Sequence, residues 1–242
     1  MVKQKNYIAF QFNIYCMQKV LNFSSKEKEQ IKKVLSKFEE KKTTNQFEEK
    51  RAIIDDSTVT LYSSGKLMIQ GKDCEKISEE LQRLIKIKSK TIVGIDETGR
   101  GEKNGPFVVS AVLGEKGKLL ELRDSKKTRN LKEKNKIVTE NSKAQIIFSL
   151  NAEYIDELRN KGETMNSIEE KAVNSITEFF DEIKEESEVL IDGKKMNGIK
   201  KGTFLVKGDD LEPVIGAASV ISKNFRENSS DKKERTSWKT KN

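Results

Sequence analysis

The chain has 242 residues, of which 34% are hydrophobic and 36% charged, and its formal net charge is +8. This length suits one large domain or two smaller ones, and no apolar run of about 18 residues is present that could cross a membrane. Histidine is absent and only two cysteines occur, which excludes imidazole triads and zinc sites built on His or on Cys clusters. Any bound metal must therefore use oxygen ligands, which favours Mg²⁺ or Mn²⁺.

The charge and the cysteines also bear on partner and compartment. A net charge of +8 favours a polyanionic partner such as nucleic acid. Cys16 and Cys74 are far apart in the chain, and the N-terminus alternates apolar with polar residues instead of forming the apolar core of a signal peptide. We therefore expect no disulfide framework and a cytoplasmic location.

Residues 1–89 predict a small α+β domain. Tyr7–Tyr15 alternates in the way of a half-buried strand, and Ser24 with Glu27 forms a capping box that starts a helix. Ser63-Ser64-Gly65 joins two short strands as a hairpin. The predicted order is β-α-β-β-β-α, with the later strands at residues 52–54, 58–62 and 66–70 and a closing helix at residues 74–85.

Residues 90–227 predict a second, α/β domain with a central sheet flanked by helices. Its strands are expected at residues 91–95, 107–113, 145–150 and 189–191, and its helices around residues 131–138, 167–183 and 213–227. The helix over residues 167–183 carries a clean apolar stripe, which indicates core packing. Residues 228–242 are polar apart from Trp238, so we expect a disordered tail.

The stretch Thr91–Pro106 is the first candidate for chemistry. Its apolar strand delivers two adjacent carboxylates, Asp96 and Glu97, and then breaks into Gly99-Arg100-Gly101. Glycines let the backbone approach a phosphate closely, and an arginine binds phosphate oxygens with two donors. The alternative is a strand end that simply turns into solvent.

Two further acids extend this candidate site. Asp192 also follows a short apolar run, and Glu227 lies on a late helix, so both could join Asp96 and Glu97. Carboxylates that converge repel one another, and two divalent cations would relieve the repulsion and support phosphodiester hydrolysis. The alternatives are that Asp192-Gly193 is only a turn and that Lys207 belongs to a turn instead of contacting phosphate.

The ordered motifs of the second domain resemble the type 2 family of ribonucleases H, which comprises ribonucleases HII and HIII. The resemblance covers residues 92–227. The matching stretches are Gly94–Gly101 with Gly105-Pro106, Asp124–Lys127, Asn166, Leu190–Gly193, Val206–Asp209, Ala217–Ser219, Lys223 and Arg226-Glu227. Each motif is weak alone, and their number and order make the set specific.

The first domain resembles the N-terminal domain of ribonuclease HIII, which has half of a TATA-binding-protein-like fold. The stretches Leu61–Lys66 and Gln70–Lys72 carry this likeness. The resemblance implies that this domain grips RNA–DNA hybrids. It also implies a C-terminally shortened member, because the family continues past the fourth carboxylate with a helical segment that this sequence lacks.

The resemblance assigns roles to individual residues. It implies metal-binding, catalytic carboxylates at Asp96, Glu97, Asp192 and Glu227. It implies substrate contacts at Gly99, Arg100, Gly101, Lys126, Lys127, Asn166 and Lys207. Glu227 follows the HIII pattern, whereas Arg100 follows the HII pattern, in which the Gly-Arg-Gly segment reads the 2′-hydroxyl at the junction ribonucleotide.

The expected function is that of a monomeric endonuclease that cuts the RNA strand of RNA–DNA hybrids with two Mg²⁺ or Mn²⁺ ions, in DNA replication and repair. It would leave a 3′-hydroxyl and a 5′-phosphate, as the family does. One alternative is a nucleic-acid-binding protein with impaired catalysis, motivated by the missing C-terminal segment. The other is cleavage at single embedded ribonucleotides, as in ribonuclease HII.

Overall fold

The computed structural model describes residues 18–85, 91–122, 130–183 and 185–238. The chain divides into two compact units, residues 1–86 and 87–242, and each has its own sheet. The expected strand Tyr7–Tyr15 and the expected substrate contacts Lys126 and Lys127 lie outside the described residues. Among the helices that are described, none has the length and apolar character needed to cross a bilayer.

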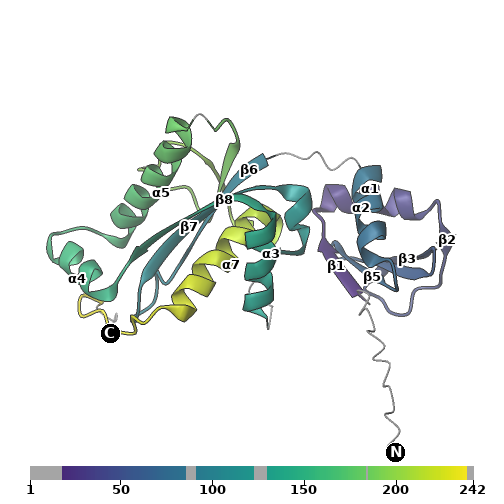
Figure 1. The fold of residues 1–242 in the computed structure, drawn as a ribbon, viewed down its shortest axis with the longest axis horizontal. Helices are drawn as coiled ribbons and strands as arrows, with labels where there is room; N and C mark the ends of the chain where they lie inside the picture. Colours follow the sequence, from purple (N-terminus) through teal and green to yellow (C-terminus); the bar gives the residue numbers. More distant parts are fainter. Residues whose placement is uncertain (1–17, 86–90, 123–129, 184, 239–242) are drawn as a thin grey trace, which may run out of the picture. The chain divides into compact units, whose positions relative to one another are not determined.

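The first unit is a five-stranded antiparallel sheet with two helices (Figure 1). The strand order is β1-β5-β4-β3-β2. The strands are β1 (Gln18–Asn22), β2 (Glu39–Glu40), β3 (Glu48–Ile54), β4 (Ser57–Tyr62) and β5 (Lys66–Gln70). The helices are α1 (Ser25–Leu35) and α2 (Cys74–Leu84). Strand β1 and the short strand β2 were not expected from the sequence, which places the first strand at Tyr7–Tyr15.

Local sequence signals account for these elements. The capping box is confirmed, because the Ser24 side chain accepts from the Glu27 backbone N–H and the Glu27 carboxylate accepts from the Ser24 N–H at 2.8 Å. Gly65 has a φ of +86°, which suits the tight hairpin between β4 and β5. The buried residues Ile31 and Leu35 of α1 pack on the sheet side of the helix.

The second unit has a mixed five-stranded sheet in the order β10-β9-β6-β7-β8. Strands β6, β7 and β8 are antiparallel, whereas β6, β9 and β10 are parallel. The strands are β6 (Thr91–Thr98), β7 (Phe107–Glu115), β8 (Ser142–Leu150), β9 (Glu188–Asp192) and β10 (Thr203–Leu205). The α-helices are α3 (Leu131–Asn141), α4 (Ala152–Asn160), α5 (Met165–Glu182), α6 (Gly208–Leu211) and α7 (Pro213–Asn228), and Lys116–Leu122 forms a 3₁₀ helix.

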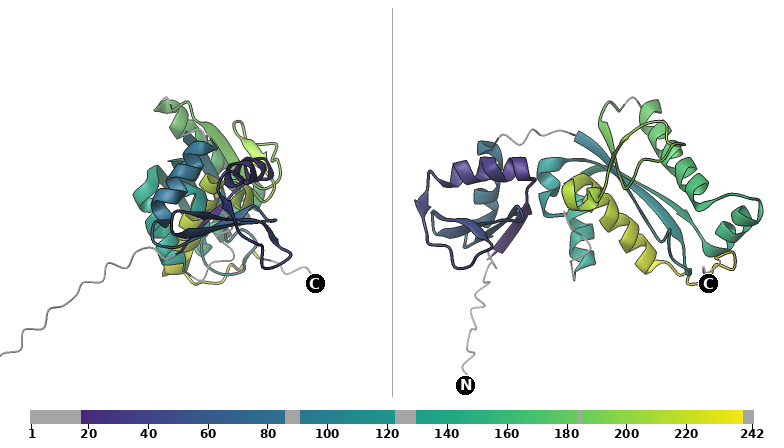
Figure 2. Two further views of the ribbon diagram at one scale, coloured as in Figure 1. Left: turned by 90° about the vertical axis from the view of Figure 1, so that its right-hand side faces the viewer. Right: turned by 180° about the vertical axis from the view of Figure 1, so that it is seen from behind.

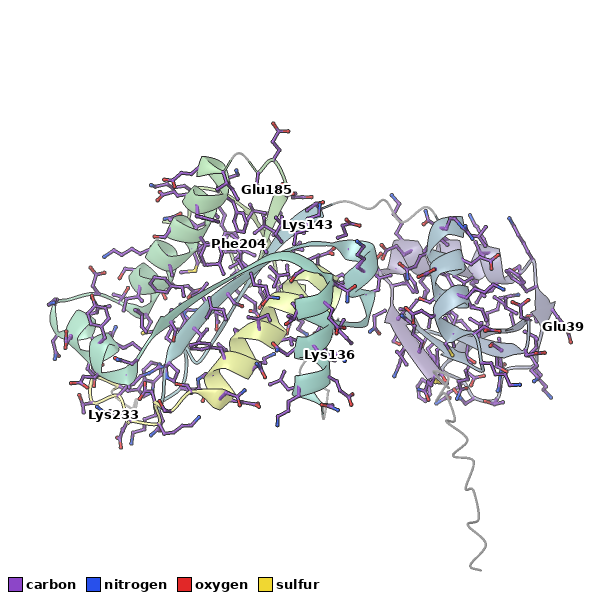
Figure 3. The ribbon with its side chains drawn as sticks, viewed as in Figure 1. Glu39, Lys136, Lys143, Glu185, Phe204 and Lys233 are labelled. Carbon is purple, nitrogen blue, oxygen red and sulfur yellow. The ribbon has the colours of Figure 1, made fainter. Side chains whose placement is uncertain are left out.

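This mixed sheet flanked by helices confirms the expected fold class. Helices α5 and α7 cover opposite faces of the sheet, as the views in Figures 1 and 2 agree. Residues of β6 alternate between the two layers, since Ile92 belongs to the core beside α7 and Val93 and Ile95 to the core beside α5. Phe204 of β10, labelled in Figure 3, packs against the α5 core.

The predicted disorder of the tail is wrong for residues 229–238. Arg235 is 1% exposed, its backbone N–H donates to Lys103 O at 2.8 Å, and its Nε donates to Gly105 O at 2.9 Å. Asp156 of α4 accepts four hydrogen bonds from the backbone N–H and hydroxyl groups of Thr236 and Ser237. The segment is thus fixed by polar contacts. Because such contacts need no regular spacing of apolar residues, the sequence shows no pattern that would predict an ordered segment.

These contacts hold the C-terminal segment against the second unit at both ends. Lys233, labelled in Figure 3, forms a 2.9 Å ion pair with Glu153 of α4, and its carbonyl accepts from Gly105 N at 2.8 Å. Trp238 packs against the core beside α5. The segment therefore joins the loop before β7 to α4 and places the Trp238 ring against the core beside α5.

Candidate active site

The end of β6 opens into a cavity of about 610 Å³. The lining combines carboxylates, the loop that follows β6, and side chains from α5, α7 and the C-terminal segment. The lining residues are Asp96, Glu97, Thr98, Gly99, Arg100, Gly101, Glu102, Met165, Asp192, Lys223 and Trp238. The cavity thus gathers three of the four predicted carboxylates and the whole predicted Gly-Arg-Gly loop.

Strand register brings Asp96 and Asp192 together. Strands β6 and β9 are parallel, and Ile95 is paired with Ile191, so the next residues of the two strands, Asp96 and Asp192, lie side by side. Because side chains alternate along a strand, both carboxylates point to the face opposite Ile95 and Ile191, which is the face covered by α7. The carboxyl ends of neighbouring parallel strands therefore place two acids at one site.

The environment of Asp96 raises the pKa of its carboxyl group to about 7. Burial is the main cause, since Asp96 is only 6% exposed, and the nearby charges of Asp192 and Glu97 act in the same direction. Hydrogen bonds from the Ser219 hydroxyl and the Glu97 backbone N–H oppose the rise. Asp96 is therefore an acid that a neighbouring positive charge would strongly favour in its ionised form.

Asp192 is fixed by the turn that follows β10. Its Oδ1 accepts a 2.5 Å hydrogen bond from the Gly208 backbone N–H. The preceding residue, Lys207, has a φ of +59° and forms the N-cap of α6, and its side chain is exposed and does not line the cavity. The stretch Lys207-Gly208 thus contributes a backbone donor to the site, and the substrate contact expected of the Lys207 side chain stays a prediction.

Glu97 and Glu227 are placed differently from the aspartate pair. Glu97 follows Asp96 on the same strand, so it starts from the opposite face of the sheet, toward α5. Glu227 lies near the end of α7, is exposed, and is not among the residues that line the cavity. Across the described residues, no three acidic, cysteine or histidine side chains lie close enough together to hold a metal ion.

Arg226 of α7 packs against the Gly-Arg-Gly loop at Gly99. Gly99 has a φ of +79°, and a Cβ there would lie 2.6 Å from Arg226 Nε. Arg226 in turn donates to Pro106 O at 3.1 Å and to Asn104 O at 2.6 Å and pairs with Glu102 at 2.8 Å. The glycine is thus required by both the backbone conformation and the close approach of this guanidinium.

Arg100 itself is engaged by α5. Its Nη2 donates to Asn166 Oδ1, and its Nε lies 2.8 Å from Glu169 Oε2. Asn166, predicted to bind substrate, is therefore a partner of Arg100. Glu169 is not predicted from the sequence, because the apolar stripe of α5 indicates a core helix. The only signal for it is that a glutamate between Ile168 and Ala172 interrupts this stripe.

Three other lining residues were not assigned a role from the sequence. Lys223 donates from Nζ to the Ser219 hydroxyl at 2.6 Å, one turn earlier on α7, and so brings a cation beside the hydrogen bond to Asp96. Met165 and Trp238 form an apolar edge that also borders a second hollow lined by Arg159, Asn160, Thr164, Asn166 and Ser237. No sequence periodicity indicates these positions.

The donor set fits a hard divalent cation. Asp96, Glu97 and Asp192 supply carboxylate oxygens in one cavity. The pKa of Asp96 is raised mainly by burial and also by the charges of Asp192 and Glu97, so a bound cation would stabilise its ionised form. Because no three such ligands converge among the described residues, ion binding would require these side chains to move, and Glu97 is only partly buried.

The fold and the site together define a ribonuclease H-like α/β protein with a separate N-terminal α+β unit. The family model for ribonuclease HII matches residues 93–242, and the model for a domain of unknown function, DUF3378, matches residues 18–91. The chain belongs to the ribonuclease HII family and is thus a ribonuclease of the ribonuclease H class.

Curated relatives and solved structures agree with this placement. Ribonuclease HII of Francisella tularensis subsp. mediasiatica is 36% identical over 142 residues, which are 57% of this chain and 72% of the relative. Ribonuclease HII of Francisella philomiragia is 33% identical over 141 residues, with the same coverage. RNase H3 of Aquifex aeolicus superposes with a TM-score of 0.50 at 22% identity, covering 87% of this chain and 85% of that one.

A second structure extends the likeness of fold. Bst-RNase HIII in complex with Mn²⁺ superposes with a TM-score of 0.53 at 17% identity, covering 87% of this chain and 80% of that one. At such identities the likeness shows the fold alone. Because the coverage extends over both units, it confirms the expected structural similarity to ribonuclease HIII.

Proposed function

We propose that the chain hydrolyses the RNA strand of RNA–DNA hybrids with divalent metal ions held by carboxylates at the end of β6. The observation that carries this proposal is the juxtaposition of Asp96 and Asp192 at the ends of paired parallel strands, in one cavity with Gly99-Arg100-Gly101. Membership of the ribonuclease HII family supports the reaction class.

Some residues of the cavity would bind metal ions, and others would contact the substrate. Asp96, Glu97 and Asp192 would hold Mg²⁺ or Mn²⁺, which when bound activates water and stabilises the leaving oxygen. Gly101 is exposed and a Cβ there would meet no atom within 4 Å, so a sugar with a 2′-hydroxyl could approach the peptide groups of the loop closely at this position. The net charge of +8 supports affinity for the phosphate backbone, which should fall with salt.

The test is cleavage of a labelled hybrid by the wild-type chain and by Asp96→Asn and Asp192→Asn, with Mg²⁺ or Mn²⁺ and with EDTA. Wild-type protein should cut only with the ion, and each substitution should lower the rate by more than about 100-fold, since even the indirect partners of metal ligands contribute 10- to 100-fold. Unchanged cleavage by Asp96→Asn would refute the assignment of this cavity.

A second candidate activity is cleavage at a single ribonucleotide embedded in DNA. The observation that favours it is Arg100, which lines the cavity and completes the Gly-Arg-Gly segment that resembles ribonuclease HII. A duplex with one ribonucleotide and a continuous hybrid, compared at equal concentration, separate the two. Efficient cutting of the first substrate would favour the HII-like activity, and cutting of the second alone the HIII-like one.

A binding protein with impaired catalysis is the remaining alternative. It is favoured by the exposed position of Glu227 and by the absence, within the described part of the chain, of three converged metal ligands. Hybrid binding measured beside cleavage decides, because binding without ion-dependent cutting would replace the nuclease proposal with this one.

A further inference from the structure

Glu169 is a buried acid that the metal-binding proposal does not use. It lies on α5 between Ile168 and Ala172, with its side chain facing the loop after β6, and it is only 6% exposed. Burying an unpaired carboxylate is strongly unfavourable, so its partner explains why an acid is tolerated on this face of the helix. That partner is Arg100, whose Nε lies 2.8 Å from Glu169 Oε2.

A second side chain of α5 completes the contact. Asn166 precedes Glu169 by three residues and therefore projects from the same side of the helix. Its Oδ1 accepts a hydrogen bond from Arg100 Nη2. The Nε–H of Arg100 does not point at Glu169 Oε2 as in a regular hydrogen bond, so the contact with Glu169 is mainly an ion pair. The hydrogen bond to Asn166 therefore sets the orientation of the Arg100 guanidinium.

The ion pair with Glu169 affects how strongly Arg100 can attract a substrate phosphate. The pKa of Glu169 is raised to about 7, mainly by burial, which outweighs the lowering effect of Arg100 and is reinforced by the charges of Glu97 and Glu170. When Glu169 is ionised, its charge opposes that of Arg100 at 2.8 Å. The acid's side chain is 8% exposed and that of Arg100 37%, so water screens the pair only in part. A paired guanidinium offers a phosphate much less net attraction than a free one.

We propose that Glu169 is a positioning residue that, with Asn166, holds Arg100 against α5, so that Arg100 fixes the shape of the Gly99–Gly101 loop instead of neutralising a substrate phosphate. This inference rests on the proposed function for its catalytic consequence and deepens the role of the same loop. It changes the role first expected of Arg100 and makes the loop backbone the surface that meets the substrate.

Salt dependence of hybrid binding provides the decisive measurement. Each phosphate neutralised by a protein cation contributes about one unit to the slope of log Kd against log salt concentration. Binding is measured in EDTA, so the result does not depend on cleavage. We expect Arg100→Gln to leave the slope of the wild-type protein unchanged within a few tenths of a unit, because Arg100 is already paired.

Glu169→Gln keeps the size of the side chain and removes its charge. It should release Arg100, steepen the slope by up to about one unit and lower kcat on the hybrid roughly tenfold with a smaller change in KM, since the loop loses its support. The double variant Glu169→Gln/Arg100→Gln should return to the wild-type slope. Glu169→Asp should recover part of the lost kcat.

The matched control is Glu182→Gln, which removes the same charge from an exposed position at the end of α5. It should change neither the slope nor kcat. A flatter slope in Arg100→Gln alone would overturn the proposal, because it would mean that Arg100 neutralises a phosphate in the native protein. Glu169→Gln with native slope and kcat would overturn it as well. If the wild-type protein proves inactive, the nuclease proposal fails. The salt-dependence slopes, which are measured in EDTA, still test the proposed role of Glu169.

Discussion

Gly94 of β6 lies directly beneath the backbone of Val214 in α7. A Cβ at Gly94 would sit 2.5 Å from the Val214 carbonyl oxygen and 2.6 Å from the Ile215 nitrogen. The absence of a side chain therefore lets the helix rest on the strand two residues before Asp96. This contact sets the distance at which Ser219 of the same helix meets the Asp96 carboxylate.

Gly94→Ala should lift α7 from the sheet. Overpacking a tight core contact costs about 1 to 3 kcal/mol, and the displaced helix should weaken the contact between Ser219 and Asp96. We expect a lower melting temperature and reduced hybrid cleavage. Gly101→Ala is the control for stability, because a Cβ there meets no atom within 4 Å, and an equal loss of stability in both variants would contradict the close approach at Gly94.

Much of this fold follows from apolar periodicity. The stripe of α5 and the apolar run of β7 predict their positions because each buries a continuous face, with Ala172, Ile176 and Val109 all at 2% exposure or less. Elements α4, α6 and β10 were not predicted from the sequence, because they are short and show little apolar periodicity. The sequence also predicted disorder where Asp156 anchors Thr236 and Ser237, because specific hydrogen bonds leave no period to detect.

The candidate site was only partly predictable for a related reason. Asp96 and Asp192 end apolar runs, and this pattern indicates strand ends that meet at one edge of a sheet. Glu169 is a single acid within a core stripe, and its meaning depends on Arg100 arriving from another element. The position of Glu227 depends on the angle at which α7 crosses the sheet, which a sequence does not specify.

The C-terminal segment can be tested through Trp238, the one tryptophan of the chain. Burial raises the pKa of Asp156, but hydrogen bonds from Ser237 and Thr236 outweigh it and lower the pKa to about 2. Asp156→Ala removes four accepted hydrogen bonds and should destabilise the segment by about 1 to 3 kcal/mol. Trp238 fluorescence should then shift to the red and be quenched more readily by iodide.

Glu153→Ala is the control for this experiment, because it removes only the exposed ion pair to Lys233. It should leave the fluorescence of Trp238 unchanged. A native emission spectrum in Asp156→Ala would contradict the anchoring of the segment by Asp156. The low pKa also implies that the anchoring persists above about pH 4 and is lost as the pH falls through about 2.

The raised pKa of Asp96 predicts how stability changes with pH in EDTA. An unfolded aspartate loses its proton near pH 4, whereas folded Asp96 keeps it up to about pH 7. The folded state therefore binds more protons in this interval, and its stability falls as the pH rises from 4 through 7. Asp96→Asn removes this dependence, so it should stabilise the protein at pH 8 and have little effect at pH 4.

Thermal unfolding of both proteins at the two pH values tests this expectation. Glu169 also has a raised pKa, so the comparison rests on the difference between wild type and Asp96→Asn, not on the wild-type curve alone. Added Mn²⁺ should raise the melting temperature of the wild type more at pH 8 than at pH 5, because the ion competes with the proton. Equal stabilisation at both values would argue against Asp96 as a ligand.

Glu227 differs from the other three predicted carboxylates in its position, and this difference can be tested by substitution. It is exposed on α7 and lies outside the cavity, whereas Asp192 lines the cavity and is held by the Gly208 N–H. We therefore expect Glu227→Gln to lower cleavage by less than about tenfold, compared with more than about 100-fold for Asp192→Asn. Equal losses, together with an equal loss of Mn²⁺-dependent stabilisation, would mean that Glu227 turns into the cavity when the ions bind. A loss of activity with full Mn²⁺-dependent stabilisation would instead assign Glu227 a role in meeting the substrate, since the metal site would then be intact without its charge.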